Sequence, residues 1–444
     1  MIIIKDTEKY MKVNGIIAEY NPFHKGHQYH LKESLCLTGA DYTIVVMSGN
    51  FVQRGAPALL DKHTRAEMAL RCGADLVLEL PTLYAVSSAE YFAIGAVTLL
   101  DKLEVVTHLS FGSEHGETES LCRIAACLSE ESAEYSASIR HFLKSGLTYP
   151  ESRARALAEV HALSSQDYMY SWETSAPLSG NEMLSPETLN SLLSSPNNIL
   201  GTEYIRALLK RKSSVVPVTI KRLGAGYHDE FISGSDSPCS ALAIRQALYK
   251  ASPEETVLPM PPESEMLLRA WMREYRPVCS DDFSSVLYYK LLKEKETGYE
   301  KYLDVPAELS NRIRNQLNRF AGYENFCHLL KTKNMTYTRI SRCLLHILLD
   351  LEKENMLLAK ALDYIPYARV LGFRRTAKPL LSTIRKCASI PLVTKMADAE
   401  KNLSADAYRL LKQDIHAGDI FRCVAFEGSG RSVGSELSLS PVIL

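Results

Sequence analysis

Two histidines, His24 and His27, lie three residues apart shortly after a short apolar run, Val13 to Ala18. The run has the length of a buried strand, and Asn21 and Pro22 are turn residues that would end it. Paired imidazoles can donate hydrogen bonds to negative charge that develops on a phosphate during a reaction. Their types and spacing therefore indicate phosphate chemistry at the end of a strand.

A helix is predicted to follow at about 28–37, so that Gly26 and His27 open it. A helix N-terminus has unpaired backbone N–H groups and a partial positive charge, and both suit phosphate. Gly26 lets the backbone come close to a ligand. Zinc binding by His24, His27 and His30 is disfavoured, because a helical pair usually needs a spacing of four and no Cys or carboxylate partner is apparent.

The segment His24-Lys25-Gly26-His27 resembles the His-x-Gly-His signature of the nucleotidyltransferase superfamily, which holds the phosphates of ATP during adenylyl transfer. Together with residues 18–23 and the segment Met-Ser-Gly-Asn-Phe-Val-Gln-Arg-Gly at 47–55, it resembles one family, the bacterial tRNA(Met) cytidine acetate ligases. The resemblance extends from about Met11 to about Lys395. It implies a ligase that activates acetate with ATP as acetyl-adenylate. The acetyl group then passes to the exocyclic amine of the wobble cytidine in elongator tRNA(Met), giving 4-acetylcytidine.

The same resemblance implies which residues meet the substrates. His24 and His27 are expected to be catalytic, ATP with magnesium is the implied cofactor, and acetate is the co-substrate. No metal ligand is predicted among the side chains. The residues expected to bind the nucleotide are Ile17, Ala18, Glu19, Tyr20, Asn21, Pro22, Phe23, His24, Lys25, Gly26, His27, Gln28, Tyr29, His30, Gly112, Asn197, Asn198 and Arg222.

A second superfamily signature is matched only in part. Ser240, Ile244 and Arg245 are present at its place, but Leu242 and Ala243 lack the usual hydroxyl groups. Ser240 can still cap a helix. The sequence leaves open whether Arg245 reaches phosphate or pairs at the surface. The segment 195–201, which holds the two asparagines, also fits a loop that begins a helix, since Ser, Asn and Gly favour such places.

Strand and helix patterns alternate in the first half of the chain. Strands are predicted at 13–18, 43–47, 76–80, 105–111 and 215–220, and helices at 62–71 and 89–100. This alternation predicts an α/β fold with a Rossmann-like parallel sheet of the nucleotidyltransferase type. Ligands of such sheets bind beyond the carboxyl ends of the strands, where the motifs fall.

A chain of 444 residues exceeds the roughly 250–300 residues at which single cores stop growing, so more than one domain is expected. Residues 11–258 are predicted to form the ATP-binding domain, with a helical excursion at about 117–190. After a proline-rich linker, residues 263–420 are predicted to form a mostly helical tRNA-binding domain. Residues 1–10 are expected to be an N-terminal extension, and residues 421–444 a C-terminal tail.

The net charge of −1 hides an uneven distribution of basic residues. The stretches 206–222 and 369–395 contain six and seven Lys or Arg without an acid, and 310–346 contains seven with one acid. One such run is usually a solvated surface, but three in a neutral chain are the electrostatic footprint of a polyanion. The predicted tRNA contacts are Arg339, Arg342, Arg374, Arg375, Arg385 and Lys386.

Ten scattered cysteines without a Cys-x-x-Cys pair fit free thiols in a reducing cytosol. No signal peptide or membrane-spanning run is evident, so a cytoplasmic location is predicted; no protein partner is evident either. Two alternatives stay open. One is an adenylyltransferase that makes a dinucleotide or coenzyme, although such enzymes are usually much shorter. The other is a non-catalytic RNA-binding protein that keeps a relic nucleotide fold.

Overall fold

The computed structural model describes residues 11–129, 133–147, 149–163, 186–222, 240–250, 258–427 and 432–444. The predicted extension at 1–10 and part of the excursion at 117–190 lie outside the described residues. None of the described helices is long and apolar enough to cross a membrane.

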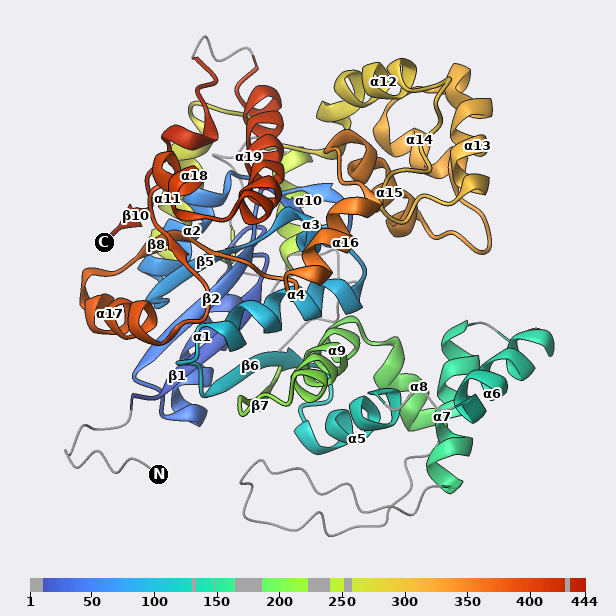
Figure 1. The fold of residues 1–444 in the computed structure, drawn as a ribbon, viewed down its shortest axis with the longest axis horizontal. Helices are drawn as coiled ribbons and strands as arrows, with labels where there is room; N and C mark the ends of the chain where they lie inside the picture. Colours follow the sequence, from blue (N-terminus) through green and yellow to red (C-terminus); the bar gives the residue numbers. More distant parts are fainter. Residues whose placement is uncertain are drawn as a thin grey trace.

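An eight-stranded sheet lies at the centre of the described chain, in the order β10-β8-β5-β2-β1-β6-β7 with β9 paired to β8 (Figure 1). Its parallel core consists of β1 (Val13–Ala18), β2 (Tyr42–Ser48), β5 (Leu76–Leu80), β6 (His108–Ser113) and β7 (Val216–Lys221). The predicted α/β fold with a largely parallel sheet is confirmed. A small two-stranded ribbon, β3 (Phe51–Val52) with β4 (Ala56–Pro57), follows β2.

Helices cover both faces of the sheet, which explains why its strands are apolar throughout. Alternate residues of β2 enter two separate cores: Ile44 and Val46 pack into one, and Val45 and Met47 into the other. The helices that follow the strands are α1 (Lys25–Thr38), α2 (Lys62–Arg71), α3 (Thr82–Ala85), α4 (Ala89–Lys102), α9 (Pro196–Arg211) and α10 (Ala241–Lys250).

Two helical lobes extend from the sheet, on the right side of Figure 1. The first belongs to the predicted excursion and contains α5 (Thr118–Ser129), α6 (Ala133–Lys144), α7 (Tyr149–Leu163) and α8 (Pro186–Ser194). The second contains α12 (Ser284–Lys293), α13 (Ala307–Gln316), α14 (Tyr323–Leu330) and α15 (Tyr337–Leu348). Further helices of the second half are α11 (Pro262–Met272), α16 (Lys353–Ala361), α17 (Lys378–Cys387), α18 (Ala399–Asn402) and α19 (Ala405–Ala425).

The second half of the chain also returns to the sheet, which the sequence analysis did not expect. β8 (Ala368–Phe373) lies antiparallel beside β5, and β9 (Leu392–Val393) and β10 (Val442–Ile443) both pair with β8. Residues 263–420 are therefore helical with two added strands, β8 and β9, and residues 421–444 begin inside α19 and end in the sheet.

Buried ion pairs hold this returning segment in place. The Arg369 guanidinium on β8 contacts Glu79 of β5 at 2.8 Å and Glu436 at 2.7 Å. Lys62, at the start of α2, contacts Glu79 at 2.7 Å and also Glu436. All four side chains are at most 2% exposed. Two carboxylates and two cations thus neutralise one another between the sheet and the C-terminal segment.

Candidate active site

A cavity of about 430 Å³ lies at the carboxyl ends of β1, β6 and β7, a size usual for small-molecule sites. Strand order reverses here, since β1 is flanked by β2 on one side and β6 on the other, and such a reversal is where parallel sheets bind ligands. The predicted nucleotide-binding residues that line it are Ile17, Ala18, Glu19, Tyr20, Asn21, His24, Lys25, Gly26, His27, Tyr29, His30, Gly112, Asn197 and Arg222.

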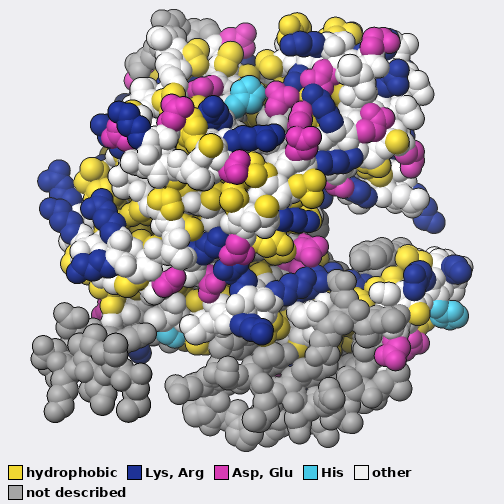
Figure 2. All heavy atoms as spheres, viewed as in Figure 1, with side chains coloured by type: hydrophobic (Ala, Val, Ile, Leu, Met, Phe, Trp, Pro, Cys, Tyr) yellow, Lys and Arg dark blue, Asp and Glu magenta, His cyan; other side chains and the backbone are white. Residues whose placement is uncertain are grey.

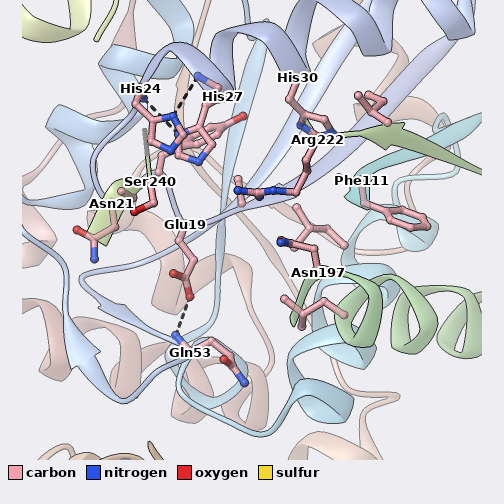
Figure 3. Close-up of a pocket in the computed structure, with 18 of the residues that line it drawn as sticks. Glu19, Asn21, His24, His27, His30, Gln53, Phe111, Asn197, Arg222 and Ser240 are labelled. Atoms are coloured by element: carbon pink, nitrogen blue, oxygen red, sulfur yellow. Dashed lines mark hydrogen bonds between the residues drawn. The ribbon is translucent and has the colours of Figure 1, made fainter. Parts of the chain in front are cut away.

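The two histidines predicted to be catalytic stack on each other at the start of α1 (Figure 3). Their ring centroids are 3.7 Å apart and the rings are inclined by 24°. Nδ1 of His24 accepts the backbone N–H of Gly26 at 3.1 Å, and Nδ1 of His27 accepts the backbone N–H of His24 at 3.3 Å. The pair therefore caps the helix that carries it.

These two hydrogen bonds fix the tautomer of both rings. A neutral imidazole has one acceptor nitrogen and one N–H donor. Because Nδ1 is the acceptor in His24 and in His27, the proton of each ring is on Nε2. Each ring therefore has an Nε2–H donor for a ligand in the cavity that both rings line.

Both rings stay neutral because the site disfavours their protonated forms. Burial, followed by Arg222 and Arg245, lowers the pKa of His24 to about 3. Burial, then His24, Arg222 and His30, holds the pKa of His27 well below its usual value. Burial and Arg222 lower the pKa of His30 to about 4. The site is thus a set of neutral donors beside fixed cations, which is suited to an anionic ligand.

Gly26 is required by the packing of the first histidine. A Cβ atom at this position would lie 2.9 Å from Cε1 and 3.0 Å from Nδ1 of His24. The ring could then not lie over the backbone and accept the Gly26 N–H. The glycine of this motif thus serves the geometry of His24, in addition to bringing the backbone close to a ligand.

The prediction of unpaired N–H groups at this helix start is wrong. The N–H of Lys25 donates to the carbonyl of Pro259 at 3.1 Å, and that of His27 to the carbonyl of His24 at 2.9 Å. The N–H of Gly26 is held by His24. The capping interactions use the first three amides, so the imidazole Nε2–H groups replace them as donors.

Arg222 follows β7 and lines the cavity together with the three histidines (Figure 3), and its charge lowers their pKa values. None of the described residues accepts a hydrogen bond from its guanidinium. A Cβ atom at Gly112, on the neighbouring strand β6, would contact the Arg222 stem at 3.5 Å. Arg222 is therefore a fixed-charge group at the cavity, where a phosphate would neutralise it.

The two predicted asparagines, Asn197 and Asn198, have different places relative to the cavity. Asn197 lines the cavity, and its amide donates to Glu114 at 2.6 Å. Asn198 is 2% exposed, and its side-chain oxygen accepts from Ser113 Oγ at 2.7 Å and from the Glu114 N–H at 3.1 Å. Asn198 therefore fixes the loop after β6 and does not line the cavity.

Three more of the predicted nucleotide contacts lie outside the cavity lining, namely Pro22, Phe23 and Gln28. Phe23 is fully buried, with its ring 4.7 Å from that of Tyr20 and 5.6 Å from that of His27. It supports the histidine from behind. Pro22 belongs to the turn before His24, and Gln28 lies on α1 outside the cavity lining.

Several lining residues were not predicted as contacts. Those from motifs noted in the sequence are Gln53, Arg54, Leu200, Ser240, Ala241, Leu242 and Arg245. Those without such a signal are Phe92, Phe111, Tyr204, Ile220 and Lys221. Most of the second set is apolar, and it provides a surface for a nucleobase or a methyl group.

In the second signature, Ser240 and Arg245 make structural hydrogen bonds at the cavity wall. Ser240 Oγ accepts the N–H of Ala243 at 3.2 Å and so caps α10. The Arg245 guanidinium donates to the carbonyl of Asn21 at 2.6 Å while it lines the cavity. Arg245 thus ties the turn before His24 to α10, and Leu242 and Ala243 need no hydroxyl for this contact.

The six predicted tRNA contacts fall into two groups. Arg339 and Arg342 lie on α15; Arg339 pairs with Asp304 at 2.7 Å, and Arg342 points to the carbonyl of Gln53 at 3.5 Å. The other four, at the end of β8 and on α17, are Arg374, Arg375, Arg385 and Lys386.

The second group lies at the amino ends of the parallel strands, opposite the ends at which the cavity lies. Since β8 is antiparallel to β5, its end at Phe373 lies beside Leu76, where β5 begins. Arg374 is partly used for structure, because its Nε donates to the carbonyl of Leu70 at 2.9 Å. Arg375 and Arg385 are exposed, and Figure 2 shows Lys and Arg side chains gathered at the left edge of the molecule, over α17.

Comparisons with known proteins agree with this arrangement. A family model described as HIGH Nucleotidyl Transferase matches residues 11–433. The tRNA(Met) cytidine acetate ligase of Acetivibrio thermocellus is 37% identical over 437 residues, which are 98% of this chain and 100% of the relative. The enzyme of the same name from Caldanaerobacter subterraneus is 40% identical over 414 residues, or 93% of this chain and 95% of the relative.

Solved structures extend the likeness to the fold. Thermotoga maritima TmcAL in its apo form superposes with a TM-score of 0.86 at 34% identity, covering 98% of this chain and 100% of the other. The same protein bound with alpha-thio ATP gives a TM-score of 0.84 at 33% identity, covering 98% and 99%. By sequence and by structure, the chain belongs to the tRNA(Met) cytidine acetate ligase family of HIGH nucleotidyl transferases.

Proposed function

We propose that this protein is an ATP-dependent ligase that activates acetate as acetyl-adenylate and acetylates the wobble cytidine of elongator tRNA(Met). One observation carries the proposal: two neutral imidazoles, His24 and His27, have their Nε2–H groups free for a ligand in the cavity, with Arg222 facing them. Since ATP and tRNA are cytoplasmic molecules, a cytoplasmic location is part of the proposal.

In the first step, a carboxylate oxygen of acetate attacks the α-phosphorus of ATP. The bond from that phosphorus to the bridging oxygen of pyrophosphate breaks, and the electron pair leaves with pyrophosphate. Donors that are already in place stabilise this developing charge without reorganisation. His24 and His27 supply two N–H donors for it, and Arg222 supplies a full positive charge.

We propose that magnesium enters this site bound to the phosphates of ATP. Among the described residues, no group of three or more His, Cys, Asp or Glu side chains could hold a metal ion. Magnesium usually keeps several waters and takes one or two protein carboxylates with substrate phosphates. A donor set of histidines and arginine fits the phosphates and not the cation.

We propose that the tRNA meets both basic groups, one beside the cavity and one at α17. The two groups lie at α15 and at α17, on opposite sides of the sheet in Figure 1, and an extended polyanion can contact both. Figure 2 shows a hollow between the lobe of α12–α15 and that of α6–α8, with Lys and Arg side chains on its rim. Such a basic hollow suits the RNA segment that carries the reacting base.

The direct test is incubation with labelled acetate, ATP and tRNA(Met), followed by digestion to nucleosides. The proposal predicts labelled 4-acetylcytidine that depends on ATP. Acetyl-CoA in place of acetate and ATP should give none. Label in a small-molecule dinucleotide, with unmodified tRNA, would instead indicate an adenylyltransferase.

A further inference from the structure

Glu19 is the only carboxylate among the described residues that line the cavity. The cations around it are Lys25, Arg54, Lys221, Arg222 and Arg245. In a cavity that binds a nucleoside triphosphate, these cations would neutralise the phosphates. The phosphates would repel a carboxylate. A carboxylate at this place suits a ligand group that donates a proton or a hydrogen bond, such as an amine or a hydroxyl, and not a phosphate.

Glu19 faces away from His24 and His27, the proposed phosphate donors (Figure 3). Figure 3 shows its carboxylate directed toward Gln53, on the side opposite the rings of His24 and His27. Oε1 accepts the backbone N–H of Gln53 at 2.9 Å. Oε2 accepts no hydrogen bond from a described residue, so one oxygen anchors the side chain and the other is available to a ligand.

The loop that anchors Glu19 is itself rigidly held. The buried guanidinium of Arg65 donates to the Glu19 carbonyl at 2.6 Å and to the Ser48 carbonyl at 3.2 Å. The carbonyl of Gly55 accepts the Ser341 hydroxyl of α15 at 2.6 Å. Glu19 is thus fixed between the end of β1 and a loop bound to the α12–α15 lobe, on the side where RNA is proposed to approach.

The acetyl-transfer step needs a proton acceptor. The exocyclic amine of cytosine is a poor nucleophile because its lone pair is delocalised into the ring, and its nitrogen becomes acidic as it bonds to the acyl carbon. A positioned base that removes this proton typically contributes about 10²–10⁴ in rate. A bound adenylate has no strongly basic atom for this purpose.

The other polar groups at the cavity are poor acceptors. Nδ1 of His24 and of His27 is occupied by a backbone N–H, and Nε2 of each already has its proton. Nε2 of His30 is buried, so a substrate amine cannot reach it. Lysine and arginine side chains are hydrogen-bond donors without an acceptor atom. Oε2 of Glu19 is the available base.

We propose that Glu19 accepts the proton of the cytidine amine when the acetyl group is transferred, an inference that depends on the proposed ligase function. The amine nitrogen bonds to the acyl carbon, and its proton goes to Oε2 of Glu19. The bond from the acyl carbon to the phosphate oxygen breaks, and AMP leaves with the electron pair. Glu19 then releases the proton to solvent.

The test variant is Glu19→Gln, whose amide oxygen can still accept the Gln53 N–H but cannot take up the proton. Glu117→Gln, at a 67% exposed side chain outside the cavity, is the matched control. For each protein, three rates are measured. They are acetate-dependent ATP–pyrophosphate exchange, acetohydroxamate formation when hydroxylamine replaces RNA, and 4-acetylcytidine formation in tRNA(Met). The tRNA dissociation constant is measured in parallel.

In Glu19→Gln, exchange and acetohydroxamate formation give the reference for adenylate formation, because hydroxylamine attacks the adenylate without a protein base. Its single-turnover acetylation of tRNA should fall by about 10²-fold or more beyond any loss in these two rates, with tRNA affinity unchanged and the control unaffected. Acetylation within threefold of wild type would overturn the role of Glu19, as would a parallel loss of exchange or of tRNA affinity. If wild type itself failed in exchange, the ligase proposal would fail instead.

Discussion

Gly55 lies so close to α15 that a Cβ atom on it would be 2.5 Å from the backbone nitrogen of Arg342. Its φ of +81° is in the left-handed region, where glycine is favoured. Its carbonyl accepts the Ser341 hydroxyl at 2.6 Å. This close approach joins the loop that lines the cavity through Gln53 to the lobe of α12–α15.

Replacing Gly55 by alanine should therefore destabilise the protein by more than backbone strain alone. Gly39 is the matched control, since its φ of +59° is also left-handed but a Cβ there meets nothing within 4 Å. We expect Gly55→Ala to lower the free energy of unfolding in urea by about 1–3 kcal/mol more than Gly39→Ala, because overpacking adds to strain. Equal losses in the two variants would refute the tight contact.

The buried ion pairs at Arg369 make a second prediction. Burial alone would raise the pKa of Glu436, but Lys62 and Arg369 lower it to about 2. Glu436→Gln leaves two buried cations with one carboxylate, Glu79, and should cost about 3–5 kcal/mol of stability. Glu354→Gln, which removes an exposed pair with Arg409, should cost less than about 1 kcal/mol. Similar urea midpoints for both variants would show that the C-terminal segment is not held by this cluster.

The neutral histidines predict how stability depends on pH. In the folded protein, burial and Arg222 lower the pKa of His30 to about 4, and burial with Arg222 and Arg245 lowers that of His24 to about 3. In the unfolded chain both titrate near about 6.5. The unfolded chain thus binds more protons between these values, and the free energy of unfolding falls as pH decreases from about 6.5 to 4.

Measurement of Tm by thermal unfolding at several pH values tests this predicted loss of stability at low pH. The double variant His24→Asn with His30→Asn should show a smaller decrease in Tm over this window than wild type; asparagine at residue 24 can still cap α1. Other buried histidines, His63 and His346, keep part of the decrease. An identical pH profile in wild type and variant would mean that neither ring is held neutral.

The exposed basic residues near α17 predict a salt effect. Arg375, Arg385 and Lys386 are exposed, whereas Arg374 donates to Leu70 and would confound a test by its effect on folding. Changing the three exposed residues to Gln should weaken tRNA binding and reduce the slope of log affinity against log salt by up to about three units. Acetate-dependent exchange should persist. Wild-type affinity at every salt concentration would mean that this group does not contact tRNA.

Local patterns were sufficient for the elements nearest the site. The strand at 13–18, the helix at 62–71 and the strand at 76–80 agree with the structure to the residue. Each is an apolar or periodic segment bounded by turn or capping residues. The motif at His24 was found for the same reason, since it is complete within four residues.

Long-range contacts account for what the sequence analysis did not find. β8 was not predicted because Arg369 at its second position gives the segment the character of a basic surface run. Its partners, Glu79 and Glu436, are distant in the sequence. Phe92 and Tyr204 lie on helices α4 and α9. Whether their side chains face the cavity depends on how these helices pack on the sheet. The tautomers of the two histidines also depend on backbone geometry that spacing does not reveal.

The most direct test of the central claim is acetate-dependent exchange of labelled pyrophosphate into ATP without RNA, in wild type and in His24→Asn. Asparagine preserves the helix cap but removes the Nε2–H donor. His115→Asn, at a solvent-facing ring, is the control. We predict exchange in wild type only when acetate is present, and a loss of about 10²–10³-fold in His24→Asn. Exchange without acetate, or exchange in His24→Asn within threefold of wild type, would contradict the account.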